Sequence, residues 1–209
     1  MAITLAAAFA LAAQCAPAVA PETLLSVVQV ESRFEPLAIG VNGAPRIVVA
    51  PTSVDDAVAK AGALIAAGRS VDLGLAQINS KNLSWLGLSL AEVFEPCTNL
   101  RAAARILQDG YGRGDAARVG EQAALKTALS YYNTGHPARG FRNGYVGKVT
   151  TAAERIVPAI GGASLASPSE PAPATPTEIS PQWDVFGEVH HGRSSFVTTV
   201  SNTASGGSQ

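Results

Sequence analysis

Apolar residues recur at helical spacing in successive segments of the first 160 residues, and this pattern constrains the fold more than any other feature of the chain. The clearest stripes are Leu100, Ala103, Ala104, Leu107 and Tyr111, followed by Leu125, Ala128, Leu129 and Tyr132. The alternation of apolar and polar residues that indicates a half-buried strand does not extend over any useful length. With 47% hydrophobic and 15% charged residues, the chain can bury a core. We therefore expect a mainly α-helical domain.

Capping residues and helix breakers delimit the expected helices. These are a helix over 21–34, one over 53–68, one over 98–110, one over 121–133, and a last helix that opens at Asn143. Ser53 and Thr98 are the expected N-caps, and Ser89 with Glu92 forms a further capping box.

Two segments between these helices lack a helical pattern. Residues 38–49 are irregular and partly extended. Residues 72–79 are interrupted by a glycine, so we expect a turn there that leads into a short helix.

The first twenty residues are apolar and alanine-rich, and they allow two interpretations. The Ala-Val-Ala sequence at 18–20 would suit the cleavage site of a secretory leader. Against this, no positive residue precedes the apolar run, Cys15 lies inside it, and Pro21 would directly follow the cut. Residues at amphipathic helical spacing are Leu5, Phe9 and Ala12. We therefore expect a first helix of the domain here.

The composition changes after Ile160. Residues 161–182 are rich in proline, serine and alanine without periodicity, which is typical of an unpacked linker. Residues 183–209 contain three aromatic residues but are too few to form a core, so they either dock or stay disordered. We expect a domain over 1–160, a linker over 161–182 and a mostly disordered aromatic tail over 183–209.

Two cysteines occur, Cys15 and Cys97. Their spacing matches no metal site, so we expect no metal. They are either two buried free thiols or one disulfide that joins the first helix to the middle of the domain. These residues alone leave both possibilities open.

Glu31 is the first candidate for chemistry. Leu24, Val27 and Val28 form an i, i+3, i+4 stripe whose i+7 position is Glu31. Burial in an apolar stripe raises the pKa of a carboxyl, and a protonated carboxyl can act as the general acid of glycoside cleavage. The alternative is a glutamate at a helix end that faces solvent or pairs with Arg33.

Two further segments concentrate uncharged hydrogen-bonding groups. Residues 74–79 read GLAQIN, with the amides of Gln77 and Asn79, and residues 131–135 read YYNTG, with Tyr132 and Asn133. Amides and phenols both donate and accept hydrogen bonds, as a sugar-binding groove requires. Taken singly, Gln77 could lie on the surface and Tyr132 in the core. Trp85 could stack on a sugar or belong to the core.

In this order, these elements resemble the lytic transglycosylases of the soluble, goose-lysozyme-like group. The matching residues are Glu31-Ser32, the Gly-Leu-x-Gln-Ile and Tyr-Asn-x-Gly motifs, and Tyr145-Val146 before the final helix. The segments CAPAVAPETL, VESRFEPLAIGVNG and FEPCTNLRAAARIL resemble the branch attached to type IV secretion systems. The resemblance extends from the first helix to Ile156 and implies a lysozyme-like helical domain of the SLT type.

The resemblance also implies a reaction. Enzymes of this family cleave the β-1,4 bond between N-acetylmuramic acid and N-acetylglucosamine without water and form 1,6-anhydromuropeptides. Glu31 would act as the sole acid and base, without the second carboxylate that most glycosidases use. No acidic residue lies beside the two motifs except Asp72.

Site residues follow by motif. Gln77 and Asn79 would line the groove near the cleaved bond, and Tyr132 would hydrogen-bond near Glu31 and hold its orientation. Ser32 and Asn133 would support substrate binding. The cysteines of the family favour the Cys15–Cys97 bridge, and no cofactor is implied.

The expected partner is peptidoglycan in the periplasm or cell envelope of a Gram-negative bacterium, where the enzyme would open the wall for a secretion apparatus. The tail could also contact secretion-channel components. The net charge of -1 suggests no nucleic-acid partner, and no apolar run is long enough to span a bilayer. Two other functions remain open: a lysozyme that hydrolyses the same bond, and a non-catalytic peptidoglycan-binding module.

Overall fold

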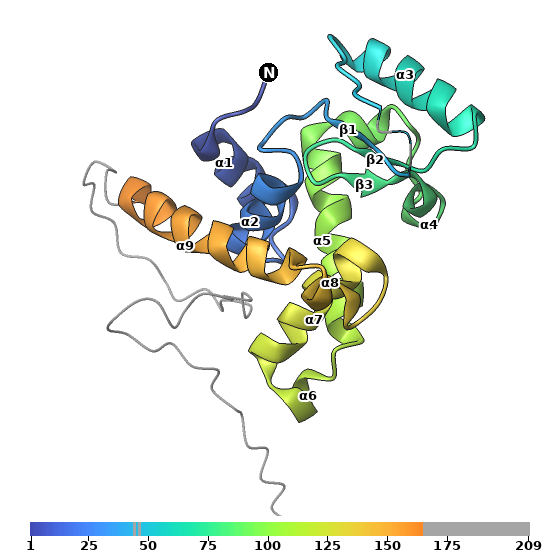
Figure 1. The fold of residues 1–209 in the computed structure, drawn as a ribbon. Helices are drawn as coiled ribbons and strands as arrows, with labels where there is room; N and C mark the ends of the chain where they lie inside the picture. The colour runs from blue at the N-terminus through green and yellow to red at the C-terminus, as the bar shows by residue number, and fades with distance from the viewer. Residues whose placement is uncertain (44, 46, 165–209) are drawn as a thin grey trace, which may run out of the picture.

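The computed structural model describes residues 1–43, 45 and 47–164, and within these residues the fold is mainly α-helical, as predicted (Figure 1). The long helices are α1 (Leu5–Cys15), α2 (Pro21–Glu31), α3 (Val54–Ala66), α5 (Pro96–Gly112), α7 (Glu121–Thr134) and α9 (Tyr145–Ser164). Short helices are α4 (Leu83–Leu86), α6 (Ala116–Val119) and α8 (Arg139–Arg142). The predicted aromatic tail and most of the predicted linker lie outside the described residues.

Helix α1 confirms the helix expected in the first twenty residues. Its buried face consists of Ala8, Ala12 and Cys15, and it packs against α2 and α5. Small side chains on this face allow close approach of the neighbouring helices, and their burial stabilises the domain. The structure therefore makes this segment part of the hydrophobic core.

Helix α2 lies at the centre of the core and begins with Pro21 at its first position, as expected. It ends at Glu31, three residues earlier than predicted. Arg33 and Phe34 have φ values of 55° and 66°, and this left-handed turn ends the helix before Pro36 is reached. The turn returns the Phe34 ring to the core, where it is 8% exposed.

A small antiparallel sheet corrects the expectation for residues 72–79. Strands β1 (Ile39–Val41), β2 (Val71–Leu73) and β3 (Ile78–Asn79) pair in that order, with Ile39 opposite Leu73. The expected turn is present, but it joins two strands, and a 3-10 turn over Ser80–Asn82 then leads into α4. Strands of two or three residues are too short to show alternation in a sequence, which is why they were not predicted.

Helices α5, α7 and α9 complete the enclosure of the core. Helix α5 starts at Pro96, two residues before the predicted cap, because proline suits the first turn of a helix. It packs along α7, while α9 packs along α2. The predicted capping pairs are present: Ser53 Oγ accepts from the Asp56 N–H, and Ser89 and Glu92 bond each other reciprocally. Across the described ranges, no helix combines the length and apolar character needed to cross a membrane.

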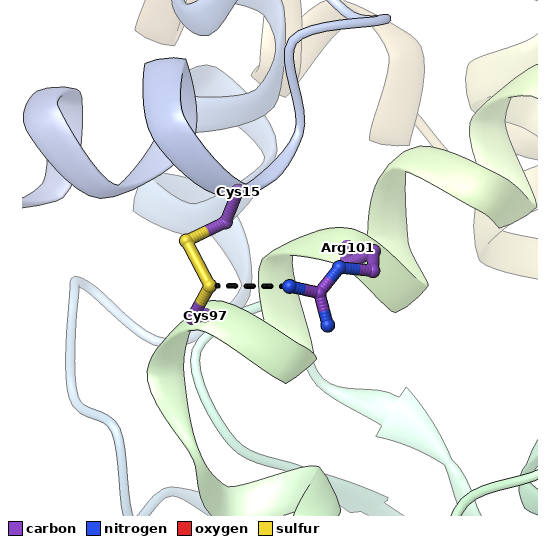
Figure 2. Close-up of a disulfide and its surroundings, with 3 residues drawn as sticks. All are labelled: Cys15, Cys97 and Arg101. Carbon is purple, nitrogen blue, oxygen red and sulfur yellow. Dashed lines mark hydrogen bonds between the residues drawn. A yellow bond between two sulfur atoms is a disulfide. The ribbon is translucent and has the colours of Figure 1, made fainter.

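A disulfide joins Cys15, at the end of α1, to Cys97, in the first turn of α5 (Figure 2). The two Cα atoms lie 5.4 Å apart although the residues are separated by 82 positions. A guanidinium N–H of Arg101, one turn along α5, donates to Cys97 Sγ at 3.5 Å. The bridge predicted from the family resemblance is therefore present, and the alternative of two free thiols is excluded.

Candidate active site

A groove of about 760 Å³ runs between the β2–β3 hairpin and helices α5 and α7. It brings together five of the six residues predicted to act on substrate, namely Glu31, Gln77, Asn79, Tyr132 and Asn133. The sixth, Ser32, does not line it. The Ser32 hydroxyl and backbone N–H instead both donate to the Val28 carbonyl, at 3.4 and 3.0 Å, and so close the end of α2.

Glu31 is the last residue of α2 and enters the groove where the buried face of that helix ends. Leu24, Val27 and Val28 on the preceding turns are fully buried, so the predicted stripe is correct. The hydrocarbon part of Glu31 continues this stripe, and the side chain is half-buried. An acid that is backed by apolar core and faces a groove is suited to proton transfer with a bound ligand.

Tyr145, at the start of α9, holds the carboxyl of Glu31. Its phenol donates to Glu31 Oε1 at 2.6 Å, and its ring is only 6% exposed. From the sequence, we expected Tyr132 to hydrogen-bond near Glu31 and hold its orientation. Burial and the nearby charge of Glu31 raise the pKa of the Tyr132 phenol, but that phenol donates to the Ala76 carbonyl at 2.6 Å. The signal for Tyr145 was its place in the quoted motif, at the N-terminus of the helix that packs on α2.

The environment of Glu31 places its titration near neutrality. Burial raises the pKa of Glu31 to about 7, against a lowering by the hydrogen bond from Tyr145 and with a further rise from the charge of Asp72. Burial and the neighbouring Glu31 also raise the pKa of Tyr145, so the phenol remains the donor in this pair. At neutral pH the carboxyl can therefore both give and take a proton.

Asp72 on β2 is a second carboxylate in the groove. Its two oxygens accept from the Asn79 side-chain amide at 2.6 Å and from the Asn42 amide at 2.8 Å. Burial raises the pKa of Asp72, and these two hydrogen bonds oppose the rise. Asn79 also donates to Ser70 Oγ at 2.9 Å, so its amide positions Asp72 as well as lining the groove.

Asn99 fixes the turn that carries Gln77 from its buried side. No sequence pattern pointed to this residue. This fully buried amide donates to the Leu73 and Val93 carbonyls at 2.9 and 2.7 Å and accepts from the Ala76 N–H at 2.8 Å. Gly74 has φ +75°, and a Cβ there would collide with the Asn99 side chain. Such a buried and satisfied polar residue defines one conformation of the turn.

Gln77 itself has a φ of 51°, and its amide donates to the Ala38 and Gly74 carbonyls at 3.0 and 2.9 Å. Its amide nitrogen is therefore used within the protein, while the side chain lines the groove. A positive φ at a residue other than glycine is uncommon because it costs energy, and it persists only where surrounding contacts enforce it. We expect the Gln77 carbonyl oxygen to be the group offered to a ligand.

Aromatic side chains form the far wall of the groove. Trp85 is 45% exposed, with the Arg105 guanidinium 5.3 Å from its ring centroid, so it is not a core tryptophan. The Arg113 guanidinium lies 5.7 Å from the Tyr131 ring. Asn133 accepts from the Asn143 amide at 2.8 Å. Exposed aromatic faces flanked by amides and cations suit sugar rings that carry acetamido and carboxylate groups.

Replacing Tyr145 by Phe should move the alkaline limb of the kcat/KM profile to higher pH. The phenol lowers the pKa of Glu31, so its loss raises that pKa and keeps the Glu31 carboxyl protonated further into the alkaline range. Because one hydrogen bond to a charged group is also lost, we expect turnover to fall roughly 10- to 100-fold. The measurement is the pH dependence of wall-fragment cleavage.

The matched counterpart is Asp72→Asn, which should move the same limb to lower pH because it removes the neighbouring negative charge that raises the pKa of Glu31. Opposite displacements in the two variants would establish that the limb belongs to Glu31. Displacements in the same direction, or none, would contradict this assignment.

Comparisons with known proteins agree with this geometry. The family model described as the transglycosylase SLT domain matches residues 9–154. The chain is 38% identical over 201 residues to the type IV secretion system protein virB1 of Brucella suis, covering 90% of this chain and 84% of that protein. It is 42% identical over 176 residues to protein virB1 of Agrobacterium fabrum, covering 84% and 69% of the two chains. No solved structure gives a significant match.

Proposed function

The chain belongs to the transglycosylase SLT domain family as a VirB1-type lytic transglycosylase, and we propose that it cleaves the β-1,4 bond between N-acetylmuramic acid and N-acetylglucosamine with formation of 1,6-anhydromuropeptides. The observation that carries this proposal is the pairing of Glu31 with Tyr145 inside the groove, with the pKa of Glu31 at about 7. A single group that titrates near neutrality can serve both halves of the reaction.

In the first half, protonated Glu31 gives its proton to the bridging oxygen. The bond from the muramoyl C1 to that oxygen breaks, the N-acetylglucosamine portion leaves with a hydroxyl, and positive charge develops at C1. Ionised Glu31, still held by the Tyr145 phenol, then lies beside this charge and stabilises it.

In the second half, the Glu31 carboxylate takes the proton of the muramoyl C6 hydroxyl. The C6 oxygen attacks C1 and closes the 1,6-anhydro ring, so the carboxyl is protonated again at the end of the cycle. No water is consumed, and no other acid is required. Tyr145 is a positioning residue here, because it acts through Glu31.

The remaining residues bind and orient the glycan. We propose that Gln77 and Asn133 contact the acetamido and hydroxyl groups of the sugars from the two sides of the groove. Asn79 contributes mainly by fixing Asp72, and Tyr132 by fixing the backbone at Ala76. Ser32 supports the site by closing α2 behind Glu31.

For the biological setting, we propose that the enzyme acts in the periplasm of a Gram-negative bacterium and opens peptidoglycan locally for a type IV secretion apparatus. The similarity to virB1 proteins of Brucella and Agrobacterium supports this setting. Contacts with channel components through the tail are part of the same proposal. The disulfide is also in keeping with an oxidising compartment.

Hydrolysis of the same bond is the second candidate, and one observation favours it. Asp72 supplies a second carboxylate in the groove, as hydrolysing glycosidases require, and it contributes to the pKa of Glu31. The anhydro reaction is preferred because both Asp72 oxygens already accept hydrogen bonds, from Asn79 and Asn42, so they are poorly placed to attack C1 or to take a proton from water.

The experiment that separates the two candidates is mass spectrometry of purified peptidoglycan digested in isotopically labelled water. A transglycosylase produces anhydromuropeptides that are lighter than the hydrolytic products by one water and carry no label. Label at the new reducing end would replace the proposed function with hydrolysis. Wall binding without any soluble product would instead favour the non-catalytic module.

A further inference from the structure

A second groove of about 810 Å³ lies between α1, α2 and α9. Figure 1 shows these three helices side by side. We call it the α9 groove and define it by its apolar residues Leu5, Val30 and Ile156 and its cations Arg33, Lys148 and Arg155. Gln29 and Val30, just before Glu31 on α2, line it, whereas Glu31 itself lines the first groove.

The charge of the α9 groove is unbalanced. Arg33, Lys148 and Arg155 are all exposed, and no acidic residue of the described chain lines the groove with them. None of the ion pairs found among the described residues involves these three cations. Three cations around an apolar floor favour a ligand that carries both carboxylates and apolar side chains.

Gly147 leaves room for a ligand in this groove. It lies in the first turn of α9, where glycine weakens a helix relative to alanine by roughly 0.5–1 kcal/mol. A Cβ added there would meet nothing within 4 Å, so no described part of the chain requires glycine at this position. A glycine that lines an open groove allows close approach of another backbone.

The chain beyond the described residues contains a segment of matching chemistry. Residues 165–209 carry four carboxylate side chains against one arginine. Residues 183–188 read Trp-Asp-Val-Phe-Gly-Glu and place two aromatic and two acidic side chains within six positions. Acids and aromatics at this spacing complement cations arranged around an apolar floor.

The chain between α9 and residues 183–188 is also long enough to reach the α9 groove. Helix α9 carries the groove residues Lys148 and Arg155 and continues to Ser164, so the tail starts about 12 Å beyond Ile156. The 165–182 segment could span up to about 60 Å when extended, which is sufficient to lead back along α9. A tethered segment has an effective concentration in the millimolar range, so even a weak contact keeps its site occupied.

We propose that residues 183–188 dock in the α9 groove of the same molecule, with Asp184 and Glu188 facing its cations and Trp183 or Phe186 over Val30 and Ile156. This docking places the tail against α2 beside Glu31, in a groove that does not contain Glu31 itself. A docked tail is withheld from other partners, and its release exposes an acidic aromatic segment. The proposal concerns binding and does not depend on the reaction that the enzyme catalyses.

The test uses the fluorescence of Trp183 in the full-length protein. Trp85 and Trp183 are the two tryptophans of the chain, so a Trp85→Phe background leaves Trp183 as the reporter. We expect blue-shifted emission and protection from acrylamide, both lost on adding Lys148→Glu with Arg155→Glu. Since each exposed charge pair changes an equilibrium severalfold, the double reversal should lower the docking constant by about tenfold or more.

Two matched controls separate docking from general effects. Lys126→Glu with Arg142→Glu changes the net charge equally at exposed positions outside the groove and should leave Trp183 protected. Gly147→Leu should fill the groove and expose Trp183, whereas Gly161→Leu on the same helix, also in open space, should not. The proposal is overturned if Trp183 is equally accessible in the parent and groove variants, if the controls release it as well, or if its protection depends on protein concentration, which would indicate a second copy.

Discussion

The Glu31→Gln variant is expected to lose peptidoglycan cleavage by roughly 10³-fold or more, because an amide of nearly the same shape cannot donate an acidic proton. Tyr145 can still donate to the amide oxygen, so the geometry of the pair should persist. Binding to isolated walls should remain, since the aromatic and amide walls of the groove are unchanged. The measurement is release of soluble muropeptides by purified protein at saturating substrate.

The same variant should be more stable than the wild type at alkaline pH. In the folded protein the pKa of Glu31 lies at about 7, above its ordinary value of 4.5, so ionisation opposes folding once the pH exceeds the ordinary value. This destabilisation of the wild type grows as the pH rises from 4.5 to about 7 and is complete above about pH 7. It amounts to about 3 kcal/mol at most, less the part that solvent screens at the open groove. At acid pH the difference should vanish.

Glu22→Gln is the matched control, because it makes the same chemical change in the first turn of the same helix, away from the groove. It should retain wild-type cleavage and should not reproduce the alkaline stabilisation. Substantial turnover by Glu31→Gln would remove Glu31 from its catalytic role. Cleavage that is absent from the wild type as well, with wall binding intact, would identify a binding module instead.

Removing the Cys15–Cys97 bridge is expected to destabilise the domain by roughly 4 kcal/mol. The bridge closes a loop of 82 residues, and a loop of this length restricts the unfolded chain strongly. It also ties α1 to α5, and α1 contributes mainly small side chains to the core. For a domain of this size the loss corresponds to a decrease in Tm of roughly 8–16 °C.

The Cys15→Ala, Cys97→Ala double variant tests this without leaving a reactive thiol. Its Tm and its denaturant midpoint should match those of the reduced wild type, and adding reductant should change neither. Well below the Tm its activity per folded molecule should be close to normal, because neither cysteine lines the groove. A wild-type Tm that does not respond to reduction would contradict the proposed contribution of the bridge.

Local sequence patterns determined most of the helical framework. Periodic stripes and capping residues act within a few positions, so the capping pairs Ser53–Asp56 and Ser89–Glu92 and the helix over Glu121–Thr134 were predictable. The position of Glu31 was also predictable, since its stripe is a property of one helix. With only two cysteines, the bridge had a single possible pairing once the family resemblance favoured it.

Other features depend on contacts between distant segments. The end of α2 at Glu31 is determined by Arg33 and Phe34 in left-handed conformations, and Phe34 returns its ring to a core built by other helices. The strands contain two or three residues each, and the hairpin is held by the buried Asn99, which lies on the distant helix α5. Periodicity within a segment carries no information about such partners.

The chemistry of the site was decided by tertiary structure in the same way. Tyr132 begins the Tyr-Asn-x-Gly motif and Tyr145 follows Asn143-Gly144, and only the packing of α9 on α2 shows that Tyr145, 114 positions away, meets Glu31. Asp72 accepts a hydrogen bond from Asn42, although helix α3 separates the two residues in sequence. The charge of Asp72, on strand β2, also acts on Glu31 at the end of α2. The sequence alone therefore singled out Glu31 as the candidate acid, while its pKa and its hydrogen-bond partner followed from burial and from distances that only the folded chain defines.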